Sequence, residues 1–237
     1  MTSERVSLLI ADISGYTEYM SSHRMTLAHA EVNTARMLES MIQAAPGFDL
    51  VEIEGDAAFL SRRVGTHDPE TTLTEILQTS AAMHRAFHLE REYVATNLCP
   101  CGGCREAGNL KLKFVAHVGE VATQTIRGRV KLVGIDVILV HRLLKNSVPI
   151  PEYVLLTEEL RNAAEASLPE PAHEISPDLE GIGTVRAYFV DVADLDDSPP
   201  PRKPSWGARL GNTFAAAGKG MPYMLGLKQP RRSRYVS

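Results

Sequence analysis

Residues 6–17, which read Val6-Ser-Leu-Leu-Ile-Ala-Asp-Ile-Ser-Gly-Tyr-Thr17, decide the fold of this chain. The short apolar run at 6–10 predicts a buried strand that delivers Asp12 to a turn. Gly15 lacks a Cβ atom, which allows that turn to be tight. From residue 17 to residue 45, apolar side chains recur at spacings of three and four, which predicts a helix with a break near Ser21.

A second acidic residue is predicted at the tip of a hairpin. Two apolar-leaning segments, 48–53 and 57–60, are separated by Glu54-Gly55-Asp56, so we expect antiparallel strands with Asp56 near the turn. Carboxylates at adjacent strand ends can hold Mg²⁺ or Mn²⁺ together with phosphate oxygens and water. The backbone carbonyl of Ile13 is a natural further ligand, and the amides that follow it can meet phosphate oxygens. An isolated Asp at a strand end is more often a turn or cap residue. The hypothesis of a metal site therefore rests on Asp12 and Asp56 occurring together.

The remaining pattern predicts an α+β fold with an antiparallel-rich sheet and helices packed on one face. Its expected elements are a helix at 71–94, a loop at 97–109, a strand at 110–118 that turns at Gly119-Glu120 into an arm through 125, a helix at 134–144, a strand at 153–156, a helix at 157–166 and a last strand at 185–192.

Charge is distributed unevenly along the chain. Eight Lys or Arg and no acid follow Asp197, so residues 1–197 carry −12 although the whole chain carries −4. We therefore expect a body at 1–193, including the 97–109 loop, that does not bind nucleic acid, because neutralising phosphates requires clustered cations. The basic tail at 194–237 is rich in Pro and Gly and is expected to be flexible. Its cations and scattered apolar side chains would suit weak binding to an anionic membrane or an acidic partner, with a solvated extension as the alternative.

Three cysteines lie within six residues as Cys99-Pro-Cys101-Gly-Gly-Cys104. Three soft ligands brought together by Pro and Gly suit Zn²⁺, which prefers four ligands in a tetrahedron. The fourth ligand is expected from His88, with His84 and His117 as alternatives, and reduced thiols without metal remain the other interpretation. Clustered thiols in odd number make a poor disulfide framework, and the first apolar run is too short for a signal peptide. Both observations favour the cytoplasm.

Four segments resemble the motifs of class III adenylate and guanylate cyclases, in the same order and over roughly residues 5–160. They are Leu9-Ile-Ala-Asp-Ile-Ser-Gly-Tyr-Thr17, Val51-Glu-Ile-Glu-Gly-Asp-Ala57, His117-Val-Gly-Glu-Val121 and Gly134-Ile-Asp-Val-Ile-Leu-Val-His-Arg-Leu143. The resemblance implies a ferredoxin-like nucleotide cyclase fold. Within cyclase-like proteins, the cysteine cluster before Lys113-Phe-Val-Ala-His117 is most similar to a bacterial branch known as DUF2652, for which no activity is implied.

The resemblance also implies roles for individual residues. It places a purine nucleoside triphosphate between two copies of the chain, which implies a homodimer. Asp12, Asp56 and the Ile13 carbonyl take the metal positions, and Arg142 takes the position of the arginine that offsets phosphoryl charge in the transition state. The nucleotide-binding positions fall on Gly15, Tyr16, Thr17, Glu52 and Lys131.

Two positions depart from the cyclase pattern. Ile138 stands at the position of the ribose-orienting asparagine and cannot form its hydrogen bond. Glu52 and Lys131 carry charges opposite to those usual in adenylate cyclases, so the choice between ATP and GTP is open, and a simple ion pair between them is the alternative. Two main hypotheses follow: a cyclase that forms a 3′,5′-cyclic nucleotide, and a catalytically silent domain that binds a nucleotide or mediates assembly. A zinc-stapled interaction module is the third.

Overall fold

The computed structural model describes residues 3–22, 27–96, 104, 106–164, 169–195, 205–207 and 210–211. Two compact units make up the chain. The first comprises Met1–Ser14, Leu38–Phe87 and Lys111–Pro199, and the second comprises Gly15–Met37, His88–Leu110 and Pro200–Ser237.

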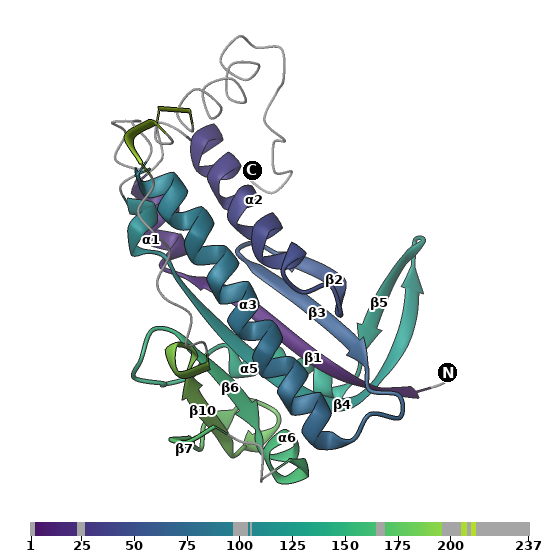
Figure 1. The fold of residues 1–237 in the computed structure, drawn as a ribbon. Coiled ribbons are helices and arrows are strands. Elements are labelled where there is room, and N and C mark those ends of the chain that lie inside the picture. Colours follow the sequence, from purple (N-terminus) through teal and green to yellow (C-terminus); the bar gives the residue numbers. More distant parts are fainter. Residues whose placement is uncertain are drawn as a thin grey trace. The chain divides into compact units, whose positions relative to one another are not determined.

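The first unit is built on one large sheet. Its eight strands are β1 (Ser3–Ser14), β2 (Asp49–Glu54), β3 (Ala57–Arg63), β4 (Lys111–Ile126), β5 (Arg129–Val133), β6 (Tyr153–Thr157), β7 (His173–Ile175) and β10 (Ala187–Asp191). The order across the sheet is β2-β3-β1-β4-β6-β10-β7, and β5 pairs with the far end of β4 (Figure 1). Strands β4 and β6 run parallel, whereas the other pairs are antiparallel. A separate small sheet contains β8 (Asp178–Leu179) and β9 (Gly183–Thr184).

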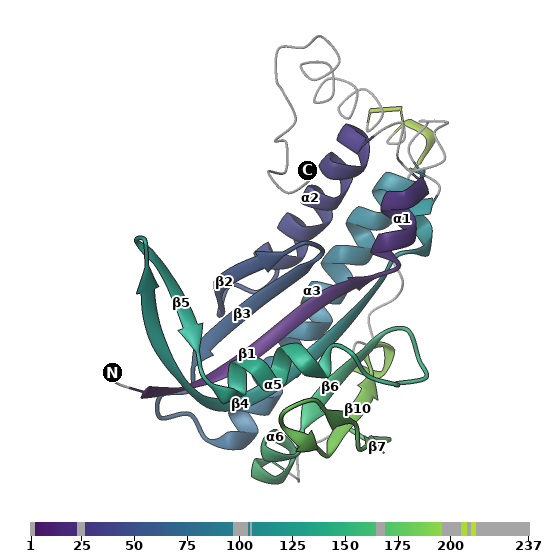
Figure 2. The same cartoon turned by 180° about the vertical axis from the view of Figure 1, so that it is seen from behind.

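The helices complete the α+β architecture, which confirms the fold class expected from the sequence, although they lie on both faces of the sheet rather than on one. They are α1 (Tyr16–Ser22), α2 (Leu27–Gln43), α3 (Pro69–Thr96), α5 (Ile135–Leu143), α6 (Glu158–Ala163) and the short 3₁₀ segments η1 (Ala107–Asn109) and η3 (Val192–Leu195). Within the first unit, α3 lies over one face of the sheet in Figure 1, and α5 covers the opposite face in Figure 2. The break expected near Ser21 falls where α1 ends, at Ser22.

The core beneath α5 follows from the alternation of side chains along the central strands. Leu8 and Ile10 of β1 are buried in one cluster with Val140 and Leu143 of α5. Because successive side chains of a strand point to opposite faces, residues two apart share a face, and Leu8 and Ile10 therefore meet the same helix. The even-numbered apolar side chains of β1 are thus held under α5, and this packing sets the position of Asp12. Asp12 lies inside β1, which continues to Ser14, rather than in a turn that follows the strand.

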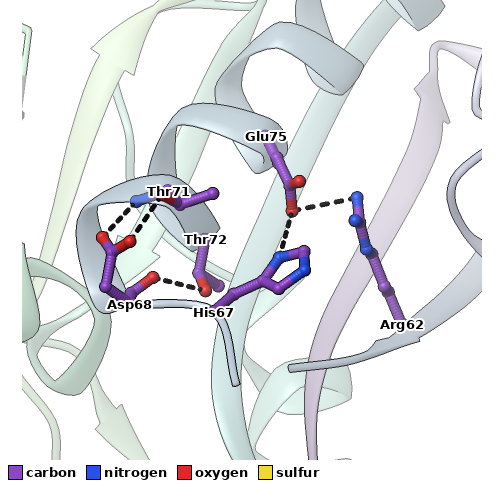
Figure 3. A network of polar contacts seen from close by, with 6 residues as sticks. All are labelled: Arg62, His67, Asp68, Thr71, Thr72 and Glu75. Atoms are coloured by element: carbon purple, nitrogen blue, oxygen red, sulfur yellow. Dashed lines mark hydrogen bonds and ion pairs between the residues drawn. The ribbon is translucent and has the colours of Figure 1, made fainter. Parts of the chain in front are cut away.

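The start of α3 is defined by an N-terminal cap (Figure 3). The Asp68 carboxylate accepts hydrogen bonds from the Thr71 amide at 2.9 Å and the Thr71 hydroxyl at 2.7 Å. These contacts satisfy donors that the first helical turn leaves without intrahelical partners, and they lower the pKa of Asp68. One turn further along α3, the Glu75 carboxylate forms an ion pair with the guanidinium of Arg62 in β3, with 2.9 Å between Arg62 Nη1 and Glu75 Oε2. This ion pair links the helix to the sheet.

The arm formed by β4 and β5 corrects the prediction of a turn at Gly119-Glu120. Strand β4 continues through both residues to Ile126, and the chain reverses at Arg127-Gly128 instead. Both turn residues have positive φ, 51° and 77°, as a two-residue hairpin loop of this twist requires. Gly119 is therefore a strand residue. Because it has no side chain, the Asp136 carboxylate can approach its backbone closely.

The C-terminal tail lies mostly outside the described residues, apart from η3 and a few positions at 205–211. Its expected flexibility and its binding to an anionic surface or an acidic partner stay predictions. Among the helices that the structure describes, none is both long enough and apolar enough to span a membrane.

Candidate functional site

Asp12 and Asp56 come together where β1 passes the tip of the β2–β3 hairpin. Asp12 pairs with Ala57 in the ladder, and the amide of Ile13 donates to the Asp56 carbonyl at 3.2 Å. The hairpin loop consists of Gly55 and Asp56 alone, with Gly55 at a φ of 67°. A residue with positive φ is needed for this tight reversal, so the glycine directly before Asp56 sets the position of the carboxylate.

The two carboxylates interact electrostatically. Burial raises the pKa of Asp56 above its usual value, and the negative charge of Asp12 raises it further. A backbone hydrogen bond and the charge of Lys113 act in the opposite direction. A carboxylate that is partly desolvated and close to another carboxylate is stabilised by an added cation, which is the electrostatic property of a metal site.

Lys113 is a third charged group at this position, and the sequence analysis did not single it out. It lies directly opposite Asp12 in the β1–β4 ladder, with its Nζ 3.1 Å from Asp12 Oδ2. The same ammonium donates to the carbonyl oxygen of Leu144, at the C-terminal end of α5, at 3.3 Å. The alternation of Lys and apolar residues along 110–114 shows that Lys113 shares a face with Lys111, but only the strand register identifies its partner.

A partly buried group of hydrogen bonds around Asn146, called here the hub, supports the segment that follows α5. The Tyr153 hydroxyl donates to Asn146 Oδ1 at 2.9 Å, and the Val148 amide donates to the same oxygen at 3.1 Å. The amide group of Asn146 in turn donates to the Leu143 carbonyl at 2.7 Å. Burial raises the pKa of Tyr153, and Asp12 adds to that effect against the influence of Asn146 and Lys113. The hub therefore lies within electrostatic range of Asp12, and it holds the end of α5 whose Leu144 carbonyl accepts from Lys113.

Glu52 and Lys131 form an ion pair. Lys131 Nζ lies 3.2 Å from Glu52 Oε2, so the arm strand β5 is linked to strand β2. Both side chains are exposed. The structure thus contains the simple ion pair that the sequence left as an alternative to base recognition.

Gly15, Tyr16 and Thr17 open the second unit. Gly15 has a φ of 84°, and its carbonyl accepts the Tyr19 amide at 3.0 Å as α1 begins. The tight turn expected at Gly15 is therefore present. The phosphate-binding role assigned to these three residues stays a prediction.

Arg142 and Ile138 both lie on α5. The guanidinium of Arg142 is 3.7 Å from Glu180 Oε2, so its described ion pair is with the β8–β9 turn rather than with Asp12 or Asp56. Ile138 is 48 % exposed, whereas Leu139 and Val140, which follow it in α5, are buried. The structure does not bring Arg142 to the carboxylates of its own chain.

His117, an alternative zinc ligand in the sequence analysis, is a buried residue in β4 with a different set of neighbours. Its Nδ1 lies 2.8 Å from the Thr157 hydroxyl, and its Nε2 lies 3.3 Å from Asp136 Oδ1. Asp136 also accepts the Glu120 amide at 2.6 Å. His117, Thr157 and Asp136 thereby link the central strand to β6 and to the first turn of α5.

The zinc hypothesis falls largely outside the described residues, because Cys99 and Cys101 are not among them. Cys104 is buried, and the side-chain amide of Asn33 lies 3.9 Å from its sulfur. His88 lies on α3, one turn after His84, whose Nε2 is 3.4 Å from Glu152 Oε1. The proposed zinc ligands Cys99, Cys101, Cys104 and His88 stay a prediction.

Comparison with solved structures shows that the chain shares the fold of class III nucleotide cyclase domains. The adenylyl cyclase CyaB from Pseudomonas aeruginosa matches with a TM-score of 0.61 at 16 % identity, over 86 % of this chain and 98 % of that one. The guanylate cyclase domain of RhGC from Catenaria anguillulae, solved in complex with GTP, matches with a TM-score of 0.59 at 14 % identity, over 80 % of this chain and 98 % of that one. At such identities the likeness concerns the fold.

Two sequence comparisons identify the family. The uncharacterized protein Rv2561/Rv2562 of Mycobacterium tuberculosis (strain ATCC 25618 / H37Rv) is 37 % identical over 196 residues, which span 82 % of this chain and 90 % of the relative. The family described as "Protein of unknown function (DUF2652)" matches residues 34–153. These residues include the Gly55-Asp56 hairpin tip, the Cys segment, Lys113 and α5. The chain therefore belongs to the DUF2652 family and carries the fold of the class III nucleotide cyclases.

Proposed function

We propose that this protein binds a purine nucleoside triphosphate together with Mg²⁺ or Mn²⁺ at Asp12 and Asp56, and converts it to a 3′,5′-cyclic nucleotide. The observation that carries the proposal is the apposition of the two carboxylates, in which burial and the charge of Asp12 raise the pKa of Asp56. Hard oxygen ligands at a partly buried, negatively charged position fit a hard divalent cation. The cyclase fold supplies the context for this chemistry.

The reaction is an in-line displacement at the α-phosphorus. The ribose 3′-oxygen forms a bond to phosphorus, the bond from phosphorus to the bridging oxygen of the pyrophosphate group breaks, and pyrophosphate leaves while the hydroxyl proton passes to solvent. Bound metal would supply stabilisation of negative charge on the attacking and leaving oxygens. Asp12, Asp56 and the carbonyl of Ile13 would hold it, and an Arg142 guanidinium would offset charge that develops on the phosphoryl group.

Recognition of the substrate would involve two further sets of residues. Opening the exposed ion pair between Glu52 and Lys131 would free a carboxylate and an ammonium to meet the edge of a purine. The backbone amides at Gly15, Tyr16 and Thr17 would meet phosphate oxygens. Glu52 suits a guanine edge, which donates hydrogen bonds, whereas Lys131 suits an acceptor, so this pair leaves both ATP and GTP as candidate substrates.

A homodimer would bring Arg142 of one copy to the carboxylates of the other. Six large apolar side chains are exposed on β2, the arm and α5 of the first unit, namely Leu50, Ile53, Ile126, Val130, Ile135 and Ile138. A groove of about 330 Å³ is lined by residues of β1, β2, β3 and the arm, among them Leu50 and Val130. Figure 2 shows the arm projecting beyond the rest of the sheet. We propose that a second copy of the chain covers this face, because a patch of exposed apolar side chains marks a protein–protein interface.

Ile138 supports a second candidate function, a nucleotide-binding signalling domain without catalysis. Its exposed aliphatic side chain cannot hydrogen-bond a ribose, so the substrate hydroxyl would lack an orienting partner at this position. Orientation contributes much of the acceleration in such displacements. Under this alternative the carboxylate pair still binds metal and nucleotide, and the dimer still forms.

One set of experiments separates these functions. Isothermal titration with ATP or GTP in the presence of Mn²⁺ measures binding, and chromatography with mass spectrometry measures cyclic nucleotide. Asp12→Asn and Asp56→Asn should each abolish metal-dependent nucleotide binding, whereas Asp178→Asn, which removes an exposed acid from β8, should not. If the protein binds the nucleotide but forms no cyclic nucleotide, the catalytically silent domain is the remaining candidate function. Binding that is unchanged in both Asn variants would refute the site itself.

A further inference from the structure

A cation already lies against the carboxylate pair. Lys113 Nζ is 3.1 Å from Asp12 Oδ2, within ion-pair distance, and both side chains are about one-fifth exposed. A partly buried ion pair is screened less by water and salt than a surface pair. The charge of Lys113 also reaches Asp56, where it opposes the effect of Asp12. One ammonium thus partly neutralises both acids.

The ammonium is held from a second side by the end of α5. It donates to the carbonyl of Leu144 at 3.3 Å. The last carbonyls of a helix lack intrahelical partners and carry partial negative charge, so they favour a cation. The Asn146 hub fixes the adjoining carbonyl of Leu143, which keeps this acceptor segment in place. Two elements therefore hold the Lys113 ammonium in place without a bound ligand: β1, through Asp12, and the end of α5, through the Leu144 carbonyl.

We propose that Lys113 is the resident counter-ion of the carboxylate pair, so that a divalent cation binds to Asp12 and Asp56 only by displacing its ammonium group. This inference rests on the proposed metal site. The flexible four-carbon stem of lysine allows the ammonium to move while its backbone stays in the β4 ladder.

Displacement has a consequence for nucleotide binding. With Lys113 in place, the two acids and the lysine sum to one negative charge, and a divalent ion would leave the site with net positive charge. The phosphates of a nucleoside triphosphate supply the anion that both the metal and the displaced ammonium require. Metal and triphosphate therefore bind cooperatively, and because such coupling is reciprocal, each raises the affinity for the other. The counter-ion thus disfavours metal binding without substrate.

The test compares metal affinity with and without a triphosphate group in the full-length protein. Titration calorimetry with MnCl₂ alone and with a preformed Mn²⁺–tripolyphosphate complex avoids any dependence on the base. Lys113→Gln removes the charge but keeps a donor for Leu144. We expect it to bind Mn²⁺ alone about tenfold more tightly and the complex about tenfold more weakly than the wild type, since one nearby charge is removed in each case.

Three variants control this experiment. Lys111→Gln removes the same charge from the same face of β4, where Lys111 meets Glu152 rather than Asp12, and should change neither affinity. Lys113→Arg keeps the charge and should bind Mn²⁺ alone as weakly as the wild type. Lys113→Met provides a second neutral variant should Lys113→Gln fail to fold.

Two outcomes separate failure of this inference from failure of the proposed site. If Asp12→Asn weakens Mn²⁺ binding but neither neutral variant at Lys113 tightens it, the counter-ion role is refuted and the metal site stands. If Asp12→Asn binds Mn²⁺ as the wild type does, the proposed site is wrong, and the inference falls with it.

Discussion

Gly119→Ala should destabilise the protein strongly, because the missing side chain of Gly119 makes room for Asp136. A methyl group at this position would overlap the Asp136 carboxylate and would lie 2.6 Å from Nε2 of His117. Gly119 is not at a positive φ, so the requirement is one of space rather than of backbone conformation. The flanking β-ladder with β1 leaves the strand little freedom to move away.

The size of this destabilisation follows from the contacts that the added methyl group would disrupt. Asp136 would have to leave the Glu120 amide, which it accepts at 2.6 Å, and a hydrogen bond to a charged group contributes about 1.5–3 kcal/mol. Overpacking beside His117 adds about 1–3 kcal/mol. We therefore expect a loss of about 2.5–6 kcal/mol in the free energy of unfolding. For a chain of this size that corresponds to a fall in melting temperature of about 5–15 °C.

Thermal unfolding followed by circular dichroism measures the effect, and a double-mutant cycle assigns its cause. In an Asp136→Ala background the carboxylate is absent, so Gly119→Ala should cost less than about half as much as in the wild type. Gly108→Ala is the control, because among the described residues an added methyl there meets Ala95 alone, at an ordinary van der Waals distance of 3.7 Å. A Gly119→Ala protein as stable as the wild type, or an equal cost in both backgrounds, would refute the reasoning.

Two further predictions concern titrating groups. The raised pKa of Asp56 means that its ionised form is disfavoured in the folded state, so wild-type protein without metal carries a penalty above that pKa which disappears below the usual value of 3.8. Asp56→Asn should therefore raise the metal-free melting temperature at pH 7 and leave it unchanged at pH 3, and a lower value at pH 7 would contradict the assignment. The lowered pKa of Asp68 has the opposite effect on stability. The ionised Asp68 cap stabilises α3 above the usual Asp pKa, and this stabilisation is lost as the pH falls through the lowered pKa. Asp68→Ala should reduce the melting temperature by about 2–4 °C at pH 7, with a smaller reduction at pH 2.5, in thermal scans at both values.

The sequence by itself determined those parts of the site that depend on local chemistry. The apolar run before Asp12 predicted a strand, and Glu54-Gly55-Asp56 between two apolar segments predicted a hairpin with Asp56 near its tip, because a tight turn is selected by the few residues inside it. The structure shortens the loop to Gly55 and Asp56, since Glu54 pairs with Ala57. The family motifs located α5 and its Arg142. The resemblance of four segments to class III cyclase motifs implied the cyclase-like fold, and the cysteine cluster before Lys113-Phe-Val-Ala-His117 implied the DUF2652 branch. Both are confirmed.

Only the tertiary structure decided which distant residues share a site. Lys113 meets Asp12 across the β1–β4 ladder, and Lys131 meets Glu52, 79 residues away in sequence, across the arm. Packing on both faces of the sheet sets the register that pairs such residues, since a slip of one residue would exchange the side chains that β1 presents to its two buried faces. Gly119 was mistaken for a turn residue for the same reason: a glycine that admits a neighbouring carboxylate and a glycine that bends the chain look alike until the packing around them is known.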